Sequence, residues 1–345
     1  MHLPDGYLSP ETTLPALAIM LVVWYSAFKK IQLIHNQALI PSIALCAAFS
    51  FILMMFNIPV VGGSSAHAVG AVLVAILVGP WAAVLAVSTT LIIQAFIFGD
   101  GGILAIGMNC LNMAVIMPFS GYAIYRLISG KATLGSKRNS VAVFIAAYVG
   151  INLAGLAAGI EMGIQPLLFK AANGAPLYGF YSLAVAVPAM LFAHGLFAGP
   201  LEGVISVLAL GYVIKFAPHL LVRESQCRVD SLNTTQGWFA KNKAVLAVFI
   251  GAIILSPLGL LTSGTAYGEW APDEVKQLIG YVPQGMAKYA DKWHALMPDY
   301  SLPKFGESFM SQSMGYVLSA LVGILIISAL ILLSAKLTRR LERRN

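Results

Sequence analysis

The sequence predicts an all-α, polytopic helical membrane protein, with about seven transmembrane helices followed by a C-terminal hairpin of two helices. Composition is the first reason: 59% of the 345 residues are hydrophobic and 10% are charged, whereas soluble domains carry about 25% charged residues. The second reason is the recurrence of apolar runs of about 20 residues, the length of a helix that crosses about 30 Å of hydrocarbon. The third is the position of the basic residues.

Nine apolar runs, each bounded by Pro, Gly or charged residues, are the expected crossings. One of them, 179–216, is too long for a single perpendicular crossing and contains Pro188 and Pro200. We expect it to cross once, as a tilted, kinked or partly re-entrant segment. The nine runs lie near residues 11–28, 38–56, 64–79, 81–98, 102–126, 139–160, 179–216, 244–262 and 314–336.

The basic residues predict how the chain is oriented. A net charge of +7 could indicate a nucleic-acid partner, but no basic patch is interleaved with aromatic residues. The Lys and Arg residues instead lie at the ends of the expected crossings. With the N-terminus outside, sixteen of the 21 fall in cytoplasmic segments, where such residues collect. The sequence therefore predicts no nucleic-acid partner, an external N-terminus and a cytoplasmic C-terminus.

A polar segment divides the chain into two parts. Residues 224–243 are rich in Ser, Thr, Asn and Gln, which predicts a cytoplasmic linker. The linker separates a transmembrane domain, residues 1–223, from a two-helix accessory module, residues 244–345. In that module an extracytoplasmic loop, residues 263–313, joins the two helices.

Two kinds of chemistry are not expected from the residues present. Cys46, Cys110 and Cys227 form no Cys-x-x-Cys pair, so neither a disulfide framework nor a thiolate metal site is predicted. No Gly-x-x-x-x-Gly-Lys-Ser/Thr loop occurs, so the chain is not expected to bind ATP.

The first two residues carry a possible metal site. No Lys or Arg precedes the first apolar run, so Met1 is expected to be kept rather than removed with a signal peptide. The Met1 amine, the His2 amide nitrogen and the His2 imidazole can close adjacent five- and six-membered chelate rings once the amide loses its proton. Planar nitrogen coordination suits Ni(II) or Cu(II) and suits Mg(II) or Ca(II) badly. Because any chain that begins Met-His has these atoms, the pattern alone leaves the site open.

His67 offers a fourth nitrogen on the outer side. It follows Gly62-Gly63-Ser64-Ser65-Ala66, where we expect the outer start of the third helix. Two interpretations are open. His67 shares a metal with the N-terminus, or Ser64 or Ser65 caps the helix and His67 hydrogen-bonds to a neighbour.

The sequence contains three separated motifs, MHLPDGYLS at 1–9, GGSSAH at 62–67 and FGDGGILAIGMN at 98–109. These motifs resemble those of the substrate-capture subunits of cobalt and nickel energy-coupling-factor transporters. The similarity extends over about residues 1–222. Residues from 244 onward, with the motifs SPLGL at 256–260 and GEW at 268–270, resemble the small accessory subunit that is fused to some nickel-type members.

This resemblance implies a function and a set of partners. It implies that the Met1 amine, the His2 amide and imidazole and the His67 imidazole hold Ni(II) or Co(II) in one plane, and that the chain is not an enzyme. High-affinity capture would occur at the outer face of a bacterial or archaeal cell membrane, as part of an ATP-driven importer. A coupling transmembrane protein and ATPase subunits would be the partners. Ala44 and Ala48 fit the small-residue pattern with which family members dock on the coupling protein.

A metal-bound imidazole usually donates its other ring N–H to a nearby acceptor. Glu202 and His194 lie in an apolar stretch, where ionisable groups are costly and often functional, although His194 could equally be a satisfied core residue. His35, His219 and His294 fall in predicted loops and are expected at the surface. The side chains expected near the outer face that could support the ligands are Ser64, Ser65, Gln94, Asn109, Asn112, Glu161 and His194.

Two other functions remain open at this point. One is an intramembrane hydrolase that uses Ser64 or Ser65 with His67 or His194, although no Gly-x-Ser-x-Gly elbow is present. The other is a solitary metal channel or secondary carrier, which would move nickel without ATPase subunits.

Overall fold

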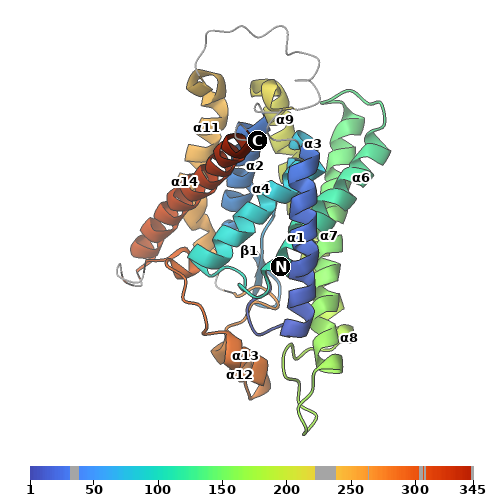
Figure 1. Ribbon diagram of the computed structural model, residues 1–345, viewed down its shortest axis with the longest axis vertical. Helices are drawn as coiled ribbons and strands as arrows, with labels where there is room; N and C mark the ends of the chain where they lie inside the picture. Colours follow the sequence, from blue (N-terminus) through green and yellow to red (C-terminus); the bar gives the residue numbers. More distant parts are fainter. Residues whose placement is uncertain (32–38, 222–237, 263, 303–305, 307, 343–345) are drawn as a thin grey trace.

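The computed structural model describes residues 1–31, 39–221, 238–262, 264–302, 306 and 308–342 (Figure 1). Helices dominate these residues. The membrane-scale elements are α1 (Pro10–Ile31), α2 (Leu39–Met54), α3 (Ala71–Val78), α4 (Pro80–Ile93), α5 (Ile106–Cys110), α6 (Met117–Ser129), α7 (Lys137–Leu168), α8 (Leu183–Ala193), α9 (Gly199–Phe216), α11 (Trp238–Leu255) and α14 (Phe309–Glu342). The remaining elements are β1 (Ile58–Val60), β2 (Ser64–Ala66), η1 (Gln94–Phe98), η2 (Leu111–Ile116), η3 (His194–Ala198), η4 (Pro218–Leu220), η5 (Ser256–Leu261), α12 (Pro272–Ile279), α13 (Gln284–Tyr289) and η6 (Pro298–Tyr300).

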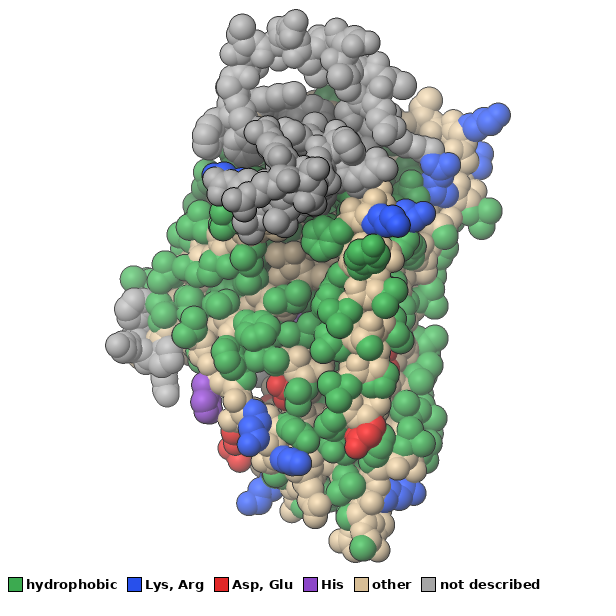
Figure 2. All heavy atoms as spheres, viewed as in Figure 1, with side chains coloured by type: hydrophobic (Ala, Val, Ile, Leu, Met, Phe, Trp, Pro, Cys, Tyr) green, Lys and Arg blue, Asp and Glu red, His purple; other side chains and the backbone are tan. Residues whose placement is uncertain are grey.

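Seven helices in the described residues are long and apolar enough to cross a membrane, which confirms a polytopic all-α membrane protein. Five of them lie before residue 222, and the other two are the expected C-terminal pair. Hydrophobic side chains cover the middle of the molecule, and Lys and Arg side chains lie toward its two ends (Figure 2). The seven are Pro10–Ile31, Pro80–Phe98, Ile106–Ser129, Lys137–Leu168, Leu183–Phe216, Asn242–Leu261 and Phe309–Ser334.

The prediction of a single helix over residues 64–79 was wrong. Residues 64–66 form strand β2, which pairs antiparallel with β1, and only Ala71–Val78 is helical. An eight-residue helix is about 12 Å long, so α3 cannot cross the hydrocarbon alone. Gly70 precedes α3 with a φ of +76° and is its N-cap, so the serine cap, one of the two interpretations left open for this segment, was wrong. Glycines at the hairpin turn and before α3 allow conformations that a periodicity argument does not detect.

The long apolar run is one continuous crossing. Helices α8 and α9 join through the π-helical segment η3. The π segment η1 ends the helical segment that begins with α4, and η2 joins α5 to α6. Single π turns of this kind occur often at functional sites.

Helix α14 packs along α2, where a Cβ on Gly323 would overlap the ring of Phe51. The two helices lie side by side in Figure 1. Ala44 and Ala48 of α2 are buried. A coupling protein could contact them only after a rearrangement, and their docking role stays a prediction.

Candidate metal centre

The N-terminal segment folds back into the molecule. Met1, His2 and Leu3 are 6%, 1% and 1% exposed, and the N-terminus lies well inside the bundle in Figure 1. Asn109 holds the backbone of Leu3 from both sides: its Oδ1 accepts from the Leu3 N–H at 2.8 Å, and its Nδ2 donates to the Leu3 carbonyl at 3.1 Å. The Gly102 N–H donates to the same carbonyl at 2.8 Å. The first residues are therefore fixed by a loop about one hundred positions away.

A second contact secures the same loop. The Asp5 carboxylate accepts hydrogen bonds from the Ile103 and Leu104 N–H groups at 3.0 and 2.8 Å. A side chain at Gly102 would overlap the Asp5 carboxylate. The paired glycines of the 98–109 motif thus let the two segments approach closely.

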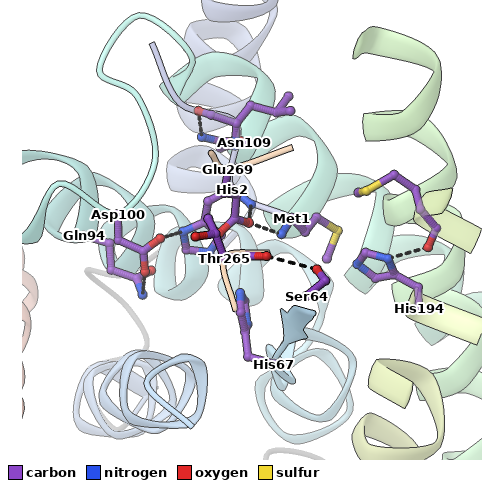
Figure 3. A network of polar contacts seen from close by, with 12 residues as sticks. Met1, His2, Ser64, His67, Gln94, Asp100, Asn109, His194, Thr265 and Glu269 are labelled. Carbon is purple, nitrogen blue, oxygen red and sulfur yellow. Dashed lines mark hydrogen bonds and ion pairs between the residues drawn. The ribbon is translucent and has the colours of Figure 1, made fainter. Parts of the chain in front are cut away.

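Two of the nitrogens proposed as ligands converge on one oxygen. The Met1 amine forms an ion pair with Glu269 Oε1, and the His2 amide N–H donates to that oxygen at 2.8 Å. Burial alone would raise the pKa of Glu269, but the Met1 amine and His2 outweigh burial and lower it. One anionic oxygen therefore lies between the amine and the amide (Figure 3).

The His2 imidazole faces Asp100. His2 Nδ1 lies 2.5 Å from Asp100 Oδ1, while the Tyr300 hydroxyl donates to Asp100 Oδ2 at 2.5 Å. Gln94 Nε2 donates to the Tyr300 hydroxyl at 2.9 Å and to Asp100 Oδ2 at 3.3 Å. Burial would lower the pKa of His2, but Asp100 outweighs it and raises the pKa above its ordinary value. His2 Nε2 is buried and has no hydrogen-bond partner among the residues that the structure describes.

His67 comes close to His2 from the loop between β2 and α3. The ring centroids are 5.1 Å apart and the rings are nearly perpendicular. His67 Nδ1 lies 3.1 Å from the Ala68 carbonyl, so a donating Nδ1–H leaves Nε2 with its lone pair free. Burial, then the Met1 amine and His2, lower the pKa of His67 to about 4. His67 is therefore neutral at neutral pH, the state in which imidazole binds metals.

These groups border one cavity of about 390 Å³. Its lining combines His2 and His67 with the acidic side chains of Asp100, Asp299 and Glu269. No cluster of three or more metal-binding His, Cys, Asp or Glu side chains occurs among the residues that the structure describes. A four-nitrogen centre here must therefore draw on main-chain nitrogens.

Comparison with known proteins identifies both parts of the chain. Residues 2–220 match the family described as the CbiM cobalt uptake substrate-specific transmembrane region, and residues 242–340 match the PDGLE domain. The chain belongs to the CbiM family. Its PDGLE domain is fused behind the CbiM region, and the resemblance found in the sequence is confirmed.

Two named relatives match this chain over both of its parts. The chain is 44% identical over 341 residues to the probable fused nickel transport protein LarMN of Lactiplantibacillus plantarum, covering 96% of each chain. It is 42% identical to the fused nickel transport protein NikMN of Rhodobacter capsulatus, covering 100% of this chain and 99% of that one. A crystal structure titled as a truncated transition metal transporter is 50% identical, with a TM-score of 0.58, and covers 62% of this chain and 98% of that chain. The protein is a transport protein and not an enzyme, so the hydrolase interpretation was wrong.

The CbiM region brings only some of the predicted supporting residues to the centre. Asn109 binds the N-terminal segment, Gln94 binds Asp100, and Ser65 lines the cavity. Ser64 Oγ donates to the Thr265 carbonyl of the PDGLE domain at 3.1 Å. None of these four hydrogen-bonds to an imidazole in the described residues.

Three predicted supporting residues lie elsewhere in the CbiM region. Asn112 donates to Glu161 at 2.8 Å. His194 Nδ1 lies 2.7 Å from the Met190 carbonyl of its own helix, and Figure 3 shows it apart from the other labelled residues. His194 is thus a satisfied core histidine.

The described side chains of the other histidines and the cysteines add no ligand to this centre. His294 is exposed. Cys46 and Cys110 are free and buried. His35, Cys227, the His219 side chain and most of the predicted linker lie outside the described residues.

Sequence reasoning missed three residues at the centre: Asp100, Glu269 and Tyr300. Asp100 is part of the GDGG sequence in the CbiM region, and Glu269 belongs to the GEW sequence of the PDGLE domain. Both motifs therefore contained a signal, an acidic residue among glycines or aromatics. Tyr300 carried none, because it follows a loop without a recognisable pattern.

Proposed function

We propose that this protein captures Ni(II), or alternatively Co(II), with high affinity at the outer membrane face and passes it to an ATP-driven energy-coupling-factor importer. The ligands are the Met1 amine, the His2 amide nitrogen, His2 Nδ1 and the His67 imidazole, in a square plane. The metal is the transported substrate. Partner subunits supply the ATPase and the coupling transmembrane protein.

One observation carries the proposal: the Met1 amine and the His2 amide nitrogen both contact Glu269 Oε1. Two nitrogens that share one partner atom can also share one metal ion, with the oxygen displaced, once the Met1 ammonium and the His2 amide have each released a proton to solvent. The six-membered chelate ring needs His2 Nδ1, so the metal also replaces Asp100 as the partner of that atom. His67, neutral and close to His2, then supplies the fourth nitrogen.

The donor set and the relatives favour nickel. Four nitrogens in a plane suit Ni(II), whereas oxygen-preferring cations gain little from them. The relatives named above are nickel transport proteins, and a cobalt transport protein CbiM from Kyrpidia tusciae is 31% identical over 227 residues. This range of names supports Ni(II) first and Co(II) second.

The orientation rests on charge. Lys29 and Lys30 end α1, and further basic residues lie between α6 and α7 and at the end of α9. Placing these ends in the cytoplasm follows the distribution of positive residues in membrane proteins. The cavity then opens to the outside, from which the metal arrives.

Purified protein with a free Met1 amine tests the proposal. We expect about one nickel ion per chain and the yellow absorption band of low-spin, planar Ni(II). A different coordination, such as six oxygen and nitrogen ligands with a weak green absorption, would contradict it. A liposome assay distinguishes an importer with partner subunits from a solitary carrier. Nickel uptake should require added ATPase and coupling subunits, and uptake by this chain alone would favour the solitary carrier.

A further inference from the structure

Glu202 is a fully buried carboxylate that the proposed chemistry does not use. It lies in the first turn of α9, just after the π segment η3, and is 0% exposed. Among the residues that the structure describes, no Lys, Arg or His forms an ion pair with it. A charge inside a membrane domain is costly unless strong hydrogen bonds satisfy it.

Within the described part of the chain, its hydrogen bonds go to two backbone N–H groups shortly after His67. Glu202 Oε2 accepts from the Val69 N–H at 2.7 Å. The Gly70 N–H is shared between Oε1 at 2.9 Å and Oε2 at 3.0 Å. Gly70 is the N-cap of α3 and Val69 comes just before it, so these N–H groups lie at the helix N-terminus, where donors lack partners within the helix. The carboxylate thus binds the segment two and three residues beyond the proposed ligand.

The same short segment is held from the other side. Ser50 Oγ of α2 donates to the Val69 carbonyl at 2.7 Å. A Cβ on Gly70 would lie 2.7 Å from the Phe49 ring. The N–H groups, the carbonyl and the Cα of this segment are thus all contacted, so the backbone two and three residues beyond His67 is held from both sides, and Glu202 supplies the contacts to its N–H groups.

We propose that Glu202 is a positioning residue for the metal centre: its carboxylate binds the Val69 and Gly70 N–H groups and so holds the His67 imidazole in the plane of the other three nitrogens. The inference rests on the proposed role of His67 as fourth ligand. It connects that ligand to the long crossing Leu183–Phe216, which otherwise makes no contribution to the centre.

The test is a double-mutant cycle between Glu202→Gln and His67→Ala, with nickel affinity measured by chelator competition. The glutamine amide turns an NH₂ group toward one backbone N–H, so the loop loses a hydrogen bond and gains a repulsive donor pair. We expect about a tenfold loss of affinity in the presence of His67. In the His67→Ala background, Glu202→Gln should cause no further loss, because the residue acts through His67. Nitrogen couplings in the Cu(II)-loaded protein should fall from four to three in Glu202→Gln.

Two results would overturn the inference. One is wild-type affinity in Glu202→Gln, and the other is an equal loss with and without His67, which is the signature of a purely structural role. If Glu202→Gln does not fold, Glu202→Asp replaces it in the same cycle, with a smaller loss expected from its shorter reach.

Glu161→Gln is the matched control, since Glu161 is a buried carboxylate that contacts Asn112 and not the His67 loop. We expect wild-type affinity from it, and a loss equal to that of Glu202→Gln would overturn the inference. Failure of the proposed function is distinguishable, because His67→Ala would then bind nickel as tightly as the wild type.

Discussion

The CbiM region and the PDGLE domain contribute different chemical groups to one cavity. The CbiM region provides every proposed ligand nitrogen and holds the N-terminal segment with contacts such as those of Asn109. The PDGLE domain provides no nitrogen, but it places Glu269 and Tyr300 against the ligands and their neighbours. The proposed ligands therefore come from one part of the chain, and the acidic groups that face them come from both.

This difference teaches how the two properties can be altered separately. Changes in the CbiM region should alter affinity directly, because they move or remove ligands. Changes in the PDGLE domain should alter the metal-free state, because its carboxylate occupies the nitrogens before the metal arrives. Asp100 lies between the two, since it belongs to the CbiM region and accepts a hydrogen bond from Tyr300.

The largest effect is expected at the N-terminus. An uncleaved N-terminal tag of several residues converts the Met1 amine into an amide and breaks the chelate. We expect nickel affinity to fall at least 100-fold, which corresponds to about 2.7 kcal/mol. Chelator competition before and after tag cleavage measures this. The same protein with a C-terminal tag is the control. Undiminished affinity in the uncleaved protein would contradict the proposed ligand set of the CbiM region, because the Met1 amine would not be needed.

Asn109→Ala should have the next largest effect. It removes two buried hydrogen bonds to Leu3, each worth about 0.5–1.5 kcal/mol net. The loosened N-terminal segment should bind nickel about tenfold more weakly. Asn173→Ala, in an exposed loop, serves as the control. Equal affinity of the two variants would mean that the chelate orders itself without Asn109.

Asp100→Asn should change the pH dependence of binding. Asp100 raises the pKa of His2, so at pH 6 a proton competes with the metal for that ring. The variant lowers the pKa of His2, so its nickel affinity should fall less than that of the wild type between pH 8 and pH 6. The two slopes should differ by at most tenfold per pH unit, which is the effect of one competing proton. His67, with a pKa of about 4, stays neutral throughout. Titrations at pH 6, 7 and 8 measure the slope, and an unchanged slope would show that His2 is not the competing group.

The smallest effect on affinity is expected from Glu269→Gln. The variant loses a competitor for two ligand nitrogens and also a negative charge beside the cation, and these changes oppose each other. We expect less than a tenfold change, or about 1.4 kcal/mol. Hydrogen exchange of residues 1–8 in the metal-free protein should nevertheless become faster, with the exposed Asp273→Asn as control. Slow exchange in both variants would mean that Glu269 does not hold the N-terminus.

Local features of the chain determined the class of protein and the candidate ligands. Composition and apolar run length require a membrane environment whatever the packing. The chelate rings of Met1 and His2 depend only on covalent connectivity, so they can be read from two letters. Counting crossings placed His67 on the same side of the membrane as the N-terminus, and His67 does lie close to His2. The helix expected around His67 was wrong, because the β1–β2 hairpin and the positive φ of Gly70 precede α3.

Tertiary structure alone decided which groups surround those ligands. Glu269 meets the Met1 amine across 268 positions, and Glu202 meets Gly70 across 132. Hydrophobic periodicity specifies which face of a helix is buried, but it carries no information about which distant polar group it will meet. Such pairings arise when packed helices bury N–H donors and carboxylates close together, because a buried polar group without a hydrogen-bond partner costs free energy.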